Sequence, residues 1–371
     1  MPYEPYKALY IHIPFCVKRC GYCDFTTHAI AQDDVRIDEY VEHLVIDIRR
    51  SAKAGDLSEI QTVYIGGGTP SHIGLSRLSS LLYALSVSVD LTREGLEFTM
   101  EANPESLDER MVRDIWALGV NRLSLGVQSF DDEVLKVLGR AHDASKARDA
   151  IRVALERFEN VSIDLMCGIP GQSSTSFEES LREAAELGVK HISVYPLTIE
   201  PHTRFDQLVL AGELDEPDED TEAEHMELAE RVLSEYGFTR YEVASYAKPG
   251  FESRHNTAYW TGVPYLGIGR SATTMTQNGV RRMRVTDGEV VDDLDRRQME
   301  AEDLMLGMRL SRGVSDERLS KACEFIPEAL AAMEELAGEG FVDHVEGRWI
   351  PTRQGWLCGN DMYSRLLELA P

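Results

Sequence analysis

Three of the six cysteines in the chain, Cys16, Cys20 and Cys23, fall within eight residues in the spacing C-x3-C-x2-C. They directly follow a short apolar run that is typical of a strand, so their thiolates can converge on one small inorganic centre. Iron–sulfur clusters are held by cysteine thiolates and usually use four of them. Phe25 stands where a fourth neighbouring cysteine would be expected. A [4Fe–4S] cluster at this loop would therefore have three protein ligands and leave one iron free for an exogenous ligand.

Three other readings of the cysteine triad compete with the cluster. A structural zinc site normally shows paired C-x2-C motifs or a Cys/His quartet, and the sequence has no second pair. A disulfide framework is typical of small secreted proteins, and the start of this chain does not resemble a secretory leader. Three unrelated buried thiols are the simplest alternative, although this spacing arises rarely by chance. The pattern favours the cluster over all three.

Length and composition predict a cytoplasmic protein of two or three domains. The chain has 371 residues, 43% of them hydrophobic, and no apolar run has the length of a membrane-spanning helix. The remaining cysteines, Cys167, Cys323 and Cys358, are unpaired by spacing and fit a reducing compartment. A net charge of −26 disfavours nucleic acid as a partner, because phosphate binding needs clustered Lys and Arg.

Short apolar runs alternate with helical periodicity through the first two thirds of the chain. The runs are Leu9–Ile13, Thr62–Ile65, Glu97–Glu101, Arg122–Leu125, Ser162–Met166 and His191–Tyr195. Such alternation predicts an α/β fold with a parallel sheet packed on helices. At least six βα units suggest a partial (β/α)6 barrel similar to a TIM barrel, whose site lies at the carboxyl ends of the strands.

The second predicted strand runs into Gly66-Gly67-Gly68-Thr69. Consecutive glycines allow a ligand to approach backbone amides closely. A phosphate-binding P-loop would need a following Gly-Lys-Ser/Thr, which is absent. Alone, this turn is a weak signal of function.

Polar residues also lie beside the ends of later strands. Glu101 ends the third strand, where a buried carboxylate is costly unless it is paired. Gln128 follows the fourth strand, Arg140 follows the helix after that strand, and Asp164 lies in the fifth strand. Each could be a capping or surface residue, but together at one end of a barrel they could bind the hydroxyl and carboxylate groups of a nucleoside.

The segment from Tyr10 to Phe25 resembles the signature of radical S-adenosylmethionine (SAM) enzymes, in particular the coproporphyrinogen dehydrogenase-like branch. The resemblance implies that SAM chelates the free iron and that reduction of the cluster, by a donor such as flavodoxin or ferredoxin, yields a 5′-deoxyadenosyl radical. It assigns Cys16, Cys20 and Cys23 to the cluster. It assigns the following residues to SAM: Tyr10, Tyr22, Gly67, Gly68, Thr69, Glu101, Gln128, Arg140, Asp164 and Leu197.

A later string, His255-Asn256-x-x-Tyr259-Trp260, resembles a haem-associated motif of the HemW haem-chaperone branch of this family. A lone histidine is usually structural, but neutral imidazole among aromatic side chains can bind haem iron. The resemblance makes His255 a candidate haem contact. Relatives commonly carry Gly-Ala-His where this chain has Arg270-Ser271-Ala272. A role that the loop has in those relatives is therefore in doubt for this chain.

The predicted domains are a radical SAM partial barrel over residues 1–245, a connecting segment over 246–298 and a C-terminal domain over 299–371. Short helices followed by a small hairpin predict a mostly helical, winged-helix-like C-terminal domain. Winged helices often bind DNA, but the acidity of this chain favours a lid or docking role.

The resemblance covers nearly the whole chain and leaves three functions to compare. The first is a HemW-like chaperone that binds haem and delivers it to haem-requiring respiratory proteins, and Phe25 and the histidine string favour it. The second is an oxygen-independent coproporphyrinogen III dehydrogenase, whose members show C-x3-C-x2-C-x-C. The third is a radical methylase or cyclopropanase. Whether the chain is an enzyme stays open at this point.

Overall fold

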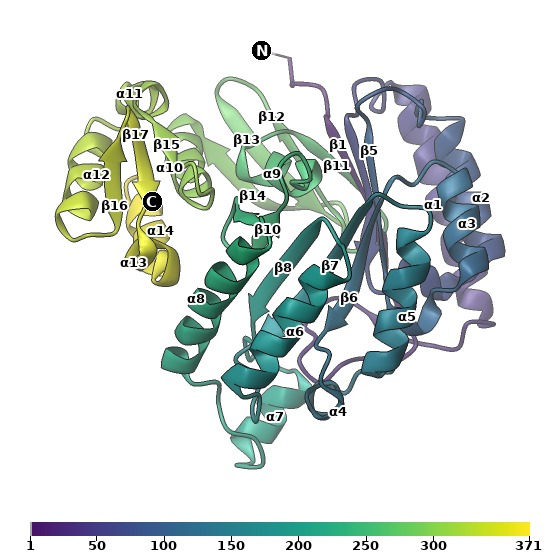
Figure 1. The fold of residues 1–371 in the computed structure, drawn as a ribbon. Helices are drawn as coiled ribbons and strands as arrows, with labels where there is room; N and C mark the ends of the chain where they lie inside the picture. The colour runs from purple at the N-terminus through teal and green to yellow at the C-terminus, as the bar shows by residue number, and fades with distance from the viewer. Residues whose placement is uncertain (1) are drawn as a thin grey trace.

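The computed structural model describes residues 2–371, and its central feature is a twelve-stranded sheet (Figure 1). Six parallel strands lie side by side in chain order in the middle of this sheet. All six were predicted, with small shifts at their ends. They are β1 (Ala8–Ile13), β4 (Thr62–Gly67), β5 (Glu97–Ala102), β6 (Arg122–Gln128), β7 (Asn160–Cys167) and β8 (His191–Pro196).

Helices that follow these strands in the chain pack along one face of the sheet (Figure 1). They are α1 (Val35–Ala54), α2 (Leu75–Ser86), α3 (Glu109–Ala117), α5 (Ala144–Leu155), α6 (Ser174–Glu186) and α8 (Glu219–Glu235). Most begin at an Asp or Ser whose side chain accepts a hydrogen bond from a backbone N–H of the first turn, as Asp108 does from Met111. These caps explain why the helices start directly after their turns.

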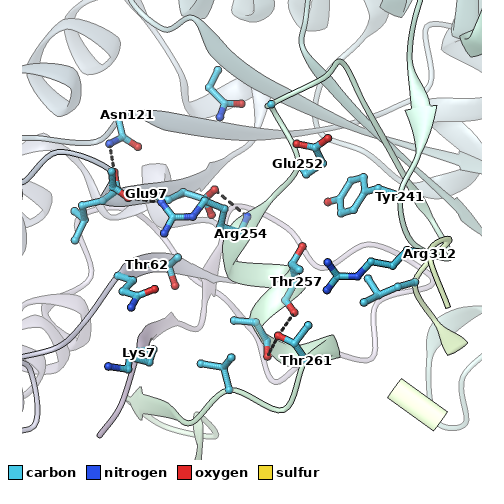
Figure 2. A pocket seen from close by; sticks show the side chains of 18 of the residues that line it. Lys7, Thr62, Glu97, Asn121, Tyr241, Glu252, Arg254, Thr257, Thr261 and Arg312 are labelled. Atoms are coloured by element: carbon cyan, nitrogen blue, oxygen red, sulfur yellow. Dashed lines mark hydrogen bonds between the residues drawn. The ribbon is translucent and has the colours of Figure 1, made fainter. Parts of the chain in front are cut away.

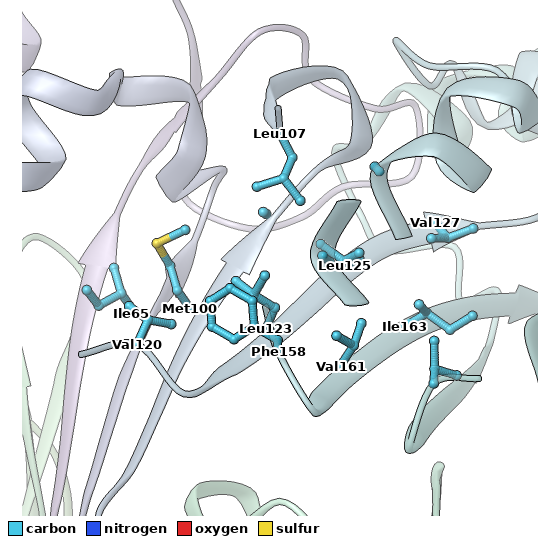
Figure 3. Close-up of a cluster of buried hydrophobic side chains, with 14 of the residues drawn as sticks. Ile65, Met100, Leu107, Val120, Leu123, Leu125, Val127, Phe158, Val161 and Ile163 are labelled. Carbon is cyan, nitrogen blue, oxygen red and sulfur yellow. The ribbon is translucent and has the colours of Figure 1, made fainter. Parts of the chain in front are cut away.

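Alternation along β6 separates the core from the barrel interior. Leu123, Leu125 and Val127 are fully buried and lie in the apolar cluster of Figure 3, with Val161 and Ile163 of β7. Successive strand side chains point to opposite faces, so the polar residues between them face inward. Each fully buried aliphatic side chain stabilises the fold by roughly 1.5–3 kcal/mol.

The sheet continues beyond the six parallel strands at both edges. At one edge, β10 (Ser245–Ala247) and β9 (Thr239–Arg240) run antiparallel. At the other, β11 (Tyr265–Ile268) pairs parallel to β1 and is followed by antiparallel β12 (Thr273–Gln277), β13 (Arg281–Thr286) and β14 (Glu289–Asp295). The sheet stays open, which confirms the partial barrel. Residues 246–298, predicted as a connecting segment, carry α9 (Arg254–Trp260) and strands of the main sheet.

The C-terminal part is mostly helical and contains a small antiparallel sheet in the order β15-β17-β16. This arrangement confirms the winged-helix-like fold, while the domain boundaries stay a prediction. Trp356 connects it to the barrel by donating from Nε1 to the carbonyl of Val243 at 2.9 Å. Its elements are α10 (Arg296–Met308), β15 (Val314–Ser315), α11 (Asp316–Cys323), α12 (Ala329–Gly338), β16 (Val342–Val345), β17 (Arg348–Pro351), α13 (Arg353–Leu357) and α14 (Gly359–Leu367).

Short elements at the carboxyl ends of the strands complete the fold. They are β2 (Phe15–Cys16), β3 (His28–Ala29), the 3₁₀ turns η1 (Pro70–Ile73) and η2 (Pro104–Ser106), α4 (Asp132–Leu138) and α7 (Arg204–Leu210). Among residues 2–371, no helix combines the length and apolarity that spanning a bilayer requires.

Candidate functional site: a cysteine pocket at the carboxyl ends of the strands

The cysteine loop leaves β1 and is held by backbone hydrogen bonds to two helical regions. Gly21 donates to the carbonyl of Leu138 at the end of α4, and its own carbonyl accepts from Phe205 in α7 at 2.8 Å. Cys16, Cys20 and Cys23 are all free thiols and half-buried. Among residues 2–371, no three His, Cys, Asp or Glu side chains meet closely enough to hold a single metal ion.

One cavity of about 150 Å³ brings most of the predicted site residues together. It opens at the carboxyl ends of β4, β5, β6 and β7, where a partial barrel is expected to place its site. The lining residues that the sequence had singled out are Cys16, Cys20, Tyr22, Cys23, Gly67, Gly68, Thr69, Glu101, Gln128, Arg140 and Asp164.

The glycine turn after β4 packs directly against the cysteine loop. Gly68 donates to the carbonyl of Ile13 and Thr69 donates to that of Phe15, each at 2.8 Å. A Cβ atom at Gly68 would lie 2.8 Å from three backbone atoms, which cannot move aside as a side chain can. The Thr69 hydroxyl lies 3.5 Å from the Cys16 sulfur. Only glycine therefore allows the two loops to approach this closely.

Arg140 connects the cysteine loop to the strand ends. Its Nη1 atom donates to the Cys20 sulfur at 3.3 Å, and its Nη2 atom donates to Asn103 Oδ1 at 2.8 Å and to the carbonyl of Gly126 at 2.7 Å. Its Nε atom is buried and has no hydrogen-bond partner among residues 2–371. Buried donors are normally satisfied, so this one is available to an acceptor on a bound group.

Two half-buried carboxyl groups, those of Glu101 and Asp164, line the pocket. Glu101 accepts from the Tyr64 hydroxyl at 2.7 Å and from the backbone N–H of Gly67 at 3.0 Å. Burial nevertheless raises the pKa of Glu101 to about 7 and that of Asp164 to about 6. Because burial penalises the charged form, a cationic group bound beside them would favour their ionisation. The pocket thus suits a ligand that carries positive charge.

Gln128 reaches the pocket through an unusual backbone conformation. Its φ angle is +68°, a left-handed value that non-glycine residues rarely adopt. The pairing of β6 with β7 also shifts register between Gly126 and Gln128. Such irregularities redirect a side chain at a strand end and are concentrated at functional sites.

Burial also raises the pKa of the Cys16 thiol to about 11. A metal-bound thiol is deprotonated, so the positive charge of an iron centre would have to offset this cost. Metal binding at this loop is therefore expected to release protons.

Two residues predicted to contact SAM lie outside the pocket lining. Tyr10 lies within the barrel, where its hydroxyl hydrogen-bonds His12 Nδ1 at 2.9 Å and its ring lies 6.1 Å from that of Tyr64. Leu197 is buried in a separate apolar cluster with Met166 and Phe205. Their predicted roles stay predictions.

The structure also places His255 away from the cysteine pocket, at the amino ends of the strands. Its ring is 1% exposed, with Nδ1 bonded to the Thr62 hydroxyl at 2.8 Å and Nε2 to the Tyr259 hydroxyl at 3.0 Å. It stacks on Tyr64, with 5.0 Å between ring centres. Both nitrogens are therefore engaged, and this geometry supports a structural role. Its assignment as a haem contact stays a prediction.

Sequence reasoning missed Asn103 and Ser124. Asn103 lines the pocket and donates to the Thr69 hydroxyl at 2.9 Å while accepting from Arg140. Ser124 also lines it and donates to Asp164 at 3.5 Å. Strand alternation could have found both, since they share a strand side with Glu101 and Gln128 respectively.

Comparison with known proteins identifies the family. Residues 10–201 match the radical SAM superfamily. The chain is 34% identical to the heme chaperone HemW of Bacillus subtilis, across 97% of this chain and 99% of that protein. It is 35% identical to the heme chaperone HemW of Mycobacterium tuberculosis, across 99% of this chain and 96% of that protein. The chain belongs to the HemW family of radical SAM proteins.

A solved structure supports the fold of this HemW-family chain. It superposes on coproporphyrinogen III oxidase (HemN) from Escherichia coli, a radical SAM enzyme, with a TM-score of 0.81 and 21% identity over 98% of this chain and 90% of that one. Radical SAM proteins use a [4Fe–4S] cluster and SAM. The three thiols, the unpartnered Arg140 donor and the two carboxyl groups of the pocket fit these groups.

Proposed function

We propose that this protein binds haem and delivers it to haem-requiring respiratory proteins. The supporting observation is the match to heme chaperone HemW relatives along almost the entire length of both chains. Phe25, which stands where coproporphyrinogen dehydrogenases carry a fourth cysteine, favours the same function.

In this proposal, the cysteine pocket is the radical SAM centre. Cys16, Cys20 and Cys23 hold the [4Fe–4S] cluster, and when bound the cluster and SAM supply one-electron chemistry. The residues around SAM are Tyr10, Tyr22, Gly67, Gly68, Thr69, Glu101, Gln128, Arg140, Asp164 and Leu197. Arg140 supplies positive charge beside Cys20, and Glu101 and Asp164 supply carboxyl groups in the same cavity.

An acidic one-electron donor such as flavodoxin or ferredoxin is the expected redox partner, in the cytoplasm. Lys18 and Arg19 are exposed in the cysteine loop, although the chain carries a net charge of −26. This local positive charge offers such a donor an approach close to the cluster.

Anaerobic reconstitution with iron and sulfide, followed by haem titration and a coproporphyrinogen III assay on the same preparation, tests this function. We expect stoichiometric haem binding, transfer of haem to an apo-cytochrome, and no protoporphyrinogen. Formation of protoporphyrinogen would instead establish the dehydrogenase. A folded preparation that contains the cluster but binds no haem would rule out the chaperone.

A further inference from the structure

A second cavity of about 1,010 Å³ lies at the opposite end of the sheet from the cysteine pocket. Thr62, Glu97 and Asn160, at the amino-terminal starts of β4, β5 and β7, form one wall, and α9 forms another. Figure 2 shows Arg312, which follows α10, on the far side of α9 from these strands. The volume is at the upper end of the range of roughly 300–1,000 Å³ for small-molecule and cofactor sites.

Three lining residues carry buried polar atoms without a hydrogen-bond partner. These atoms, among residues 2–371, are Asn160 Oδ1, Ser311 Oγ and Arg240 Nε. Arg240 Nε itself lies 3.5 Å from Glu230 Oε1, so its charge is paired although it makes no hydrogen bond. Buried polar atoms are nearly always satisfied, so the other two, Asn160 Oδ1 and Ser311 Oγ, point to a bound molecule that supplies partners.

Two guanidinium groups at this cavity form no ion pair with any acidic side chain in the described part of the chain. Arg254 donates to the carbonyl of Gly95, and no described residue accepts from the guanidinium of Arg312. The acidic side chains at the cavity are Glu97 and Glu252. Glu97 accepts from the backbone N–H groups of Arg254 and His255 at 2.9 Å each, which leaves Glu252 as the remaining carboxylate.

Apart from Lys7, which pairs with Glu59, the rest of the lining is apolar or neutral. Leu96, Ala258, Val263 and Leu310 supply apolar surface between the charged groups. The residues lining the cavity include no His, Cys or Met. Tyr241 is the one phenol there, and its hydroxyl already bonds His191 Nε2 at 2.9 Å. The cavity therefore suits a large amphipathic molecule with two carboxylates. If that molecule contains a metal, no lining side chain is a strong ligand for it.

We propose that this cavity is the porphyrin site, and that Arg254 and Arg312 bind the two propionates. The inference rests on the proposed haem function and assigns it a location. Planar guanidinium groups match carboxylates through paired hydrogen bonds. The protein therefore recognises the porphyrin by its propionates and not by its iron. Weak protein ligation of the iron suits a carrier that must release its cargo.

Titration of the reconstituted full-length protein with haem, with metal-free protoporphyrin IX and with protoporphyrin IX dimethyl ester tests this site. We expect haem and protoporphyrin IX to bind with similar affinity and the diester to bind much more weakly. Arg254→Gln and Arg312→Gln should each weaken binding by about tenfold, the typical effect of losing a charge-assisted hydrogen bond. Ala258→Trp, which fills the cavity, should weaken it further.

Arg204→Gln is the matched control, because Arg204 is also exposed and starts α7, far from this cavity in the sequence. It should bind haem like the unmodified protein. Unchanged haem affinity in folded Arg254→Gln and Arg312→Gln proteins would overturn the site and leave the proposed function intact. No haem binding by the unmodified protein would overturn both. If the protein binds haem but not protoporphyrin IX, binding depends on the iron, and the proposed propionate-binding site would also be overturned.

Discussion

Arg140 illustrates how single side chains assemble the cysteine pocket. One guanidinium reaches Cys20 from the N-terminal loop, Asn103 after β5 and the backbone of β6. Such a charge-assisted network fixes the relative positions of three segments that are distant in sequence. It leaves one donor, Nε, for a ligand.

Replacing each cysteine of the triad in turn tests which thiols hold iron. Cys16→Ser, Cys20→Ser and Cys23→Ser should each lose most of their iron and acid-labile sulfide after anaerobic reconstitution, because each removes one of only three protein ligands. Chemical iron and sulfide analysis measures this. Cys358→Ser, which alters an exposed thiol, should retain both. Full iron and sulfide in Cys20→Ser would refute the assignment.

His255 should make the fold sensitive to acid. Burial, and secondarily the charge of Arg122, lower the pKa of His255 from 6.5 to about 3. Between these values the unfolded chain binds a proton that the folded chain does not, so the free energy of unfolding falls as pH decreases from 6.5 towards 3. The contribution lost at pH 5 is roughly 2 kcal/mol.

Denaturant unfolding of the unmodified protein and of His255→Gln between pH 5 and 8 measures this effect. The stability difference between the two should shrink as pH falls, since glutamine does not titrate. Asn256→Ala is the control, because it changes a neighbouring side chain without removing a titrating group. A pH-independent difference for His255→Gln would contradict the buried, neutral state of this ring.

At the residue level, strand prediction placed Glu101, Gln128 and Asp164 in strands or beside their ends, and the resemblance to radical SAM enzymes assigned them to SAM. Alternation and proximity to strand ends are local properties, so spacing alone could mark these positions only as candidates. His255 could not be placed this way. Its surroundings are Thr62 and Tyr64 on β4, and only the tertiary fold brings α9 against that strand.

At the level of elements, the glycine turn after β4 sets the distance between two loops. Gly68→Ala would place a methyl group 2.8 Å from backbone atoms of Ile13 and Phe15. We expect a loss of about 1–3 kcal/mol in the free energy of unfolding, typical of overpacking, together with reduced iron incorporation. Thermal or denaturant unfolding and iron analysis measure both.

Gly338→Ala provides the matched substitution for this test. A Cβ atom there has no neighbour within 4 Å, and the residue ends α12. It should be neutral or stabilising by up to about 1 kcal/mol, because alanine favours helices more than glycine. Equal effects of the two substitutions would show that close approach of the loops is not what requires Gly68.

Regular elements of the barrel were predicted because apolar periodicity defines them. The strands β13 and β14 were not, because they are rich in charge. Ion pairs between the strands, such as Arg281 with Asp293 and Arg284 with Asp292, take the place of a buried apolar face. Sequence patterns based on hydrophobic alternation cannot recognise strands of this kind.

On the scale of the whole molecule, two cavities lie at opposite ends of one sheet. The proposed cluster and porphyrin sites share no lining residue, so each should load separately. Cys20→Ser should still bind protoporphyrin IX with unchanged affinity, and Arg312→Gln should still incorporate full iron and sulfide. Parallel titrations and metal analyses measure this. Loss of porphyrin binding in folded Cys20→Ser would show that the two sites are coupled.

In this proposal, three thiolates hold a [4Fe–4S] cluster with one iron open to SAM. Electron paramagnetic resonance of the anaerobically reduced protein, recorded with and without SAM, is the decisive experiment. We expect a [4Fe–4S]⁺ signal whose g values change when SAM is added. A signal that SAM leaves unchanged, or a reconstituted protein that is folded but has no cluster signal, would refute this arrangement.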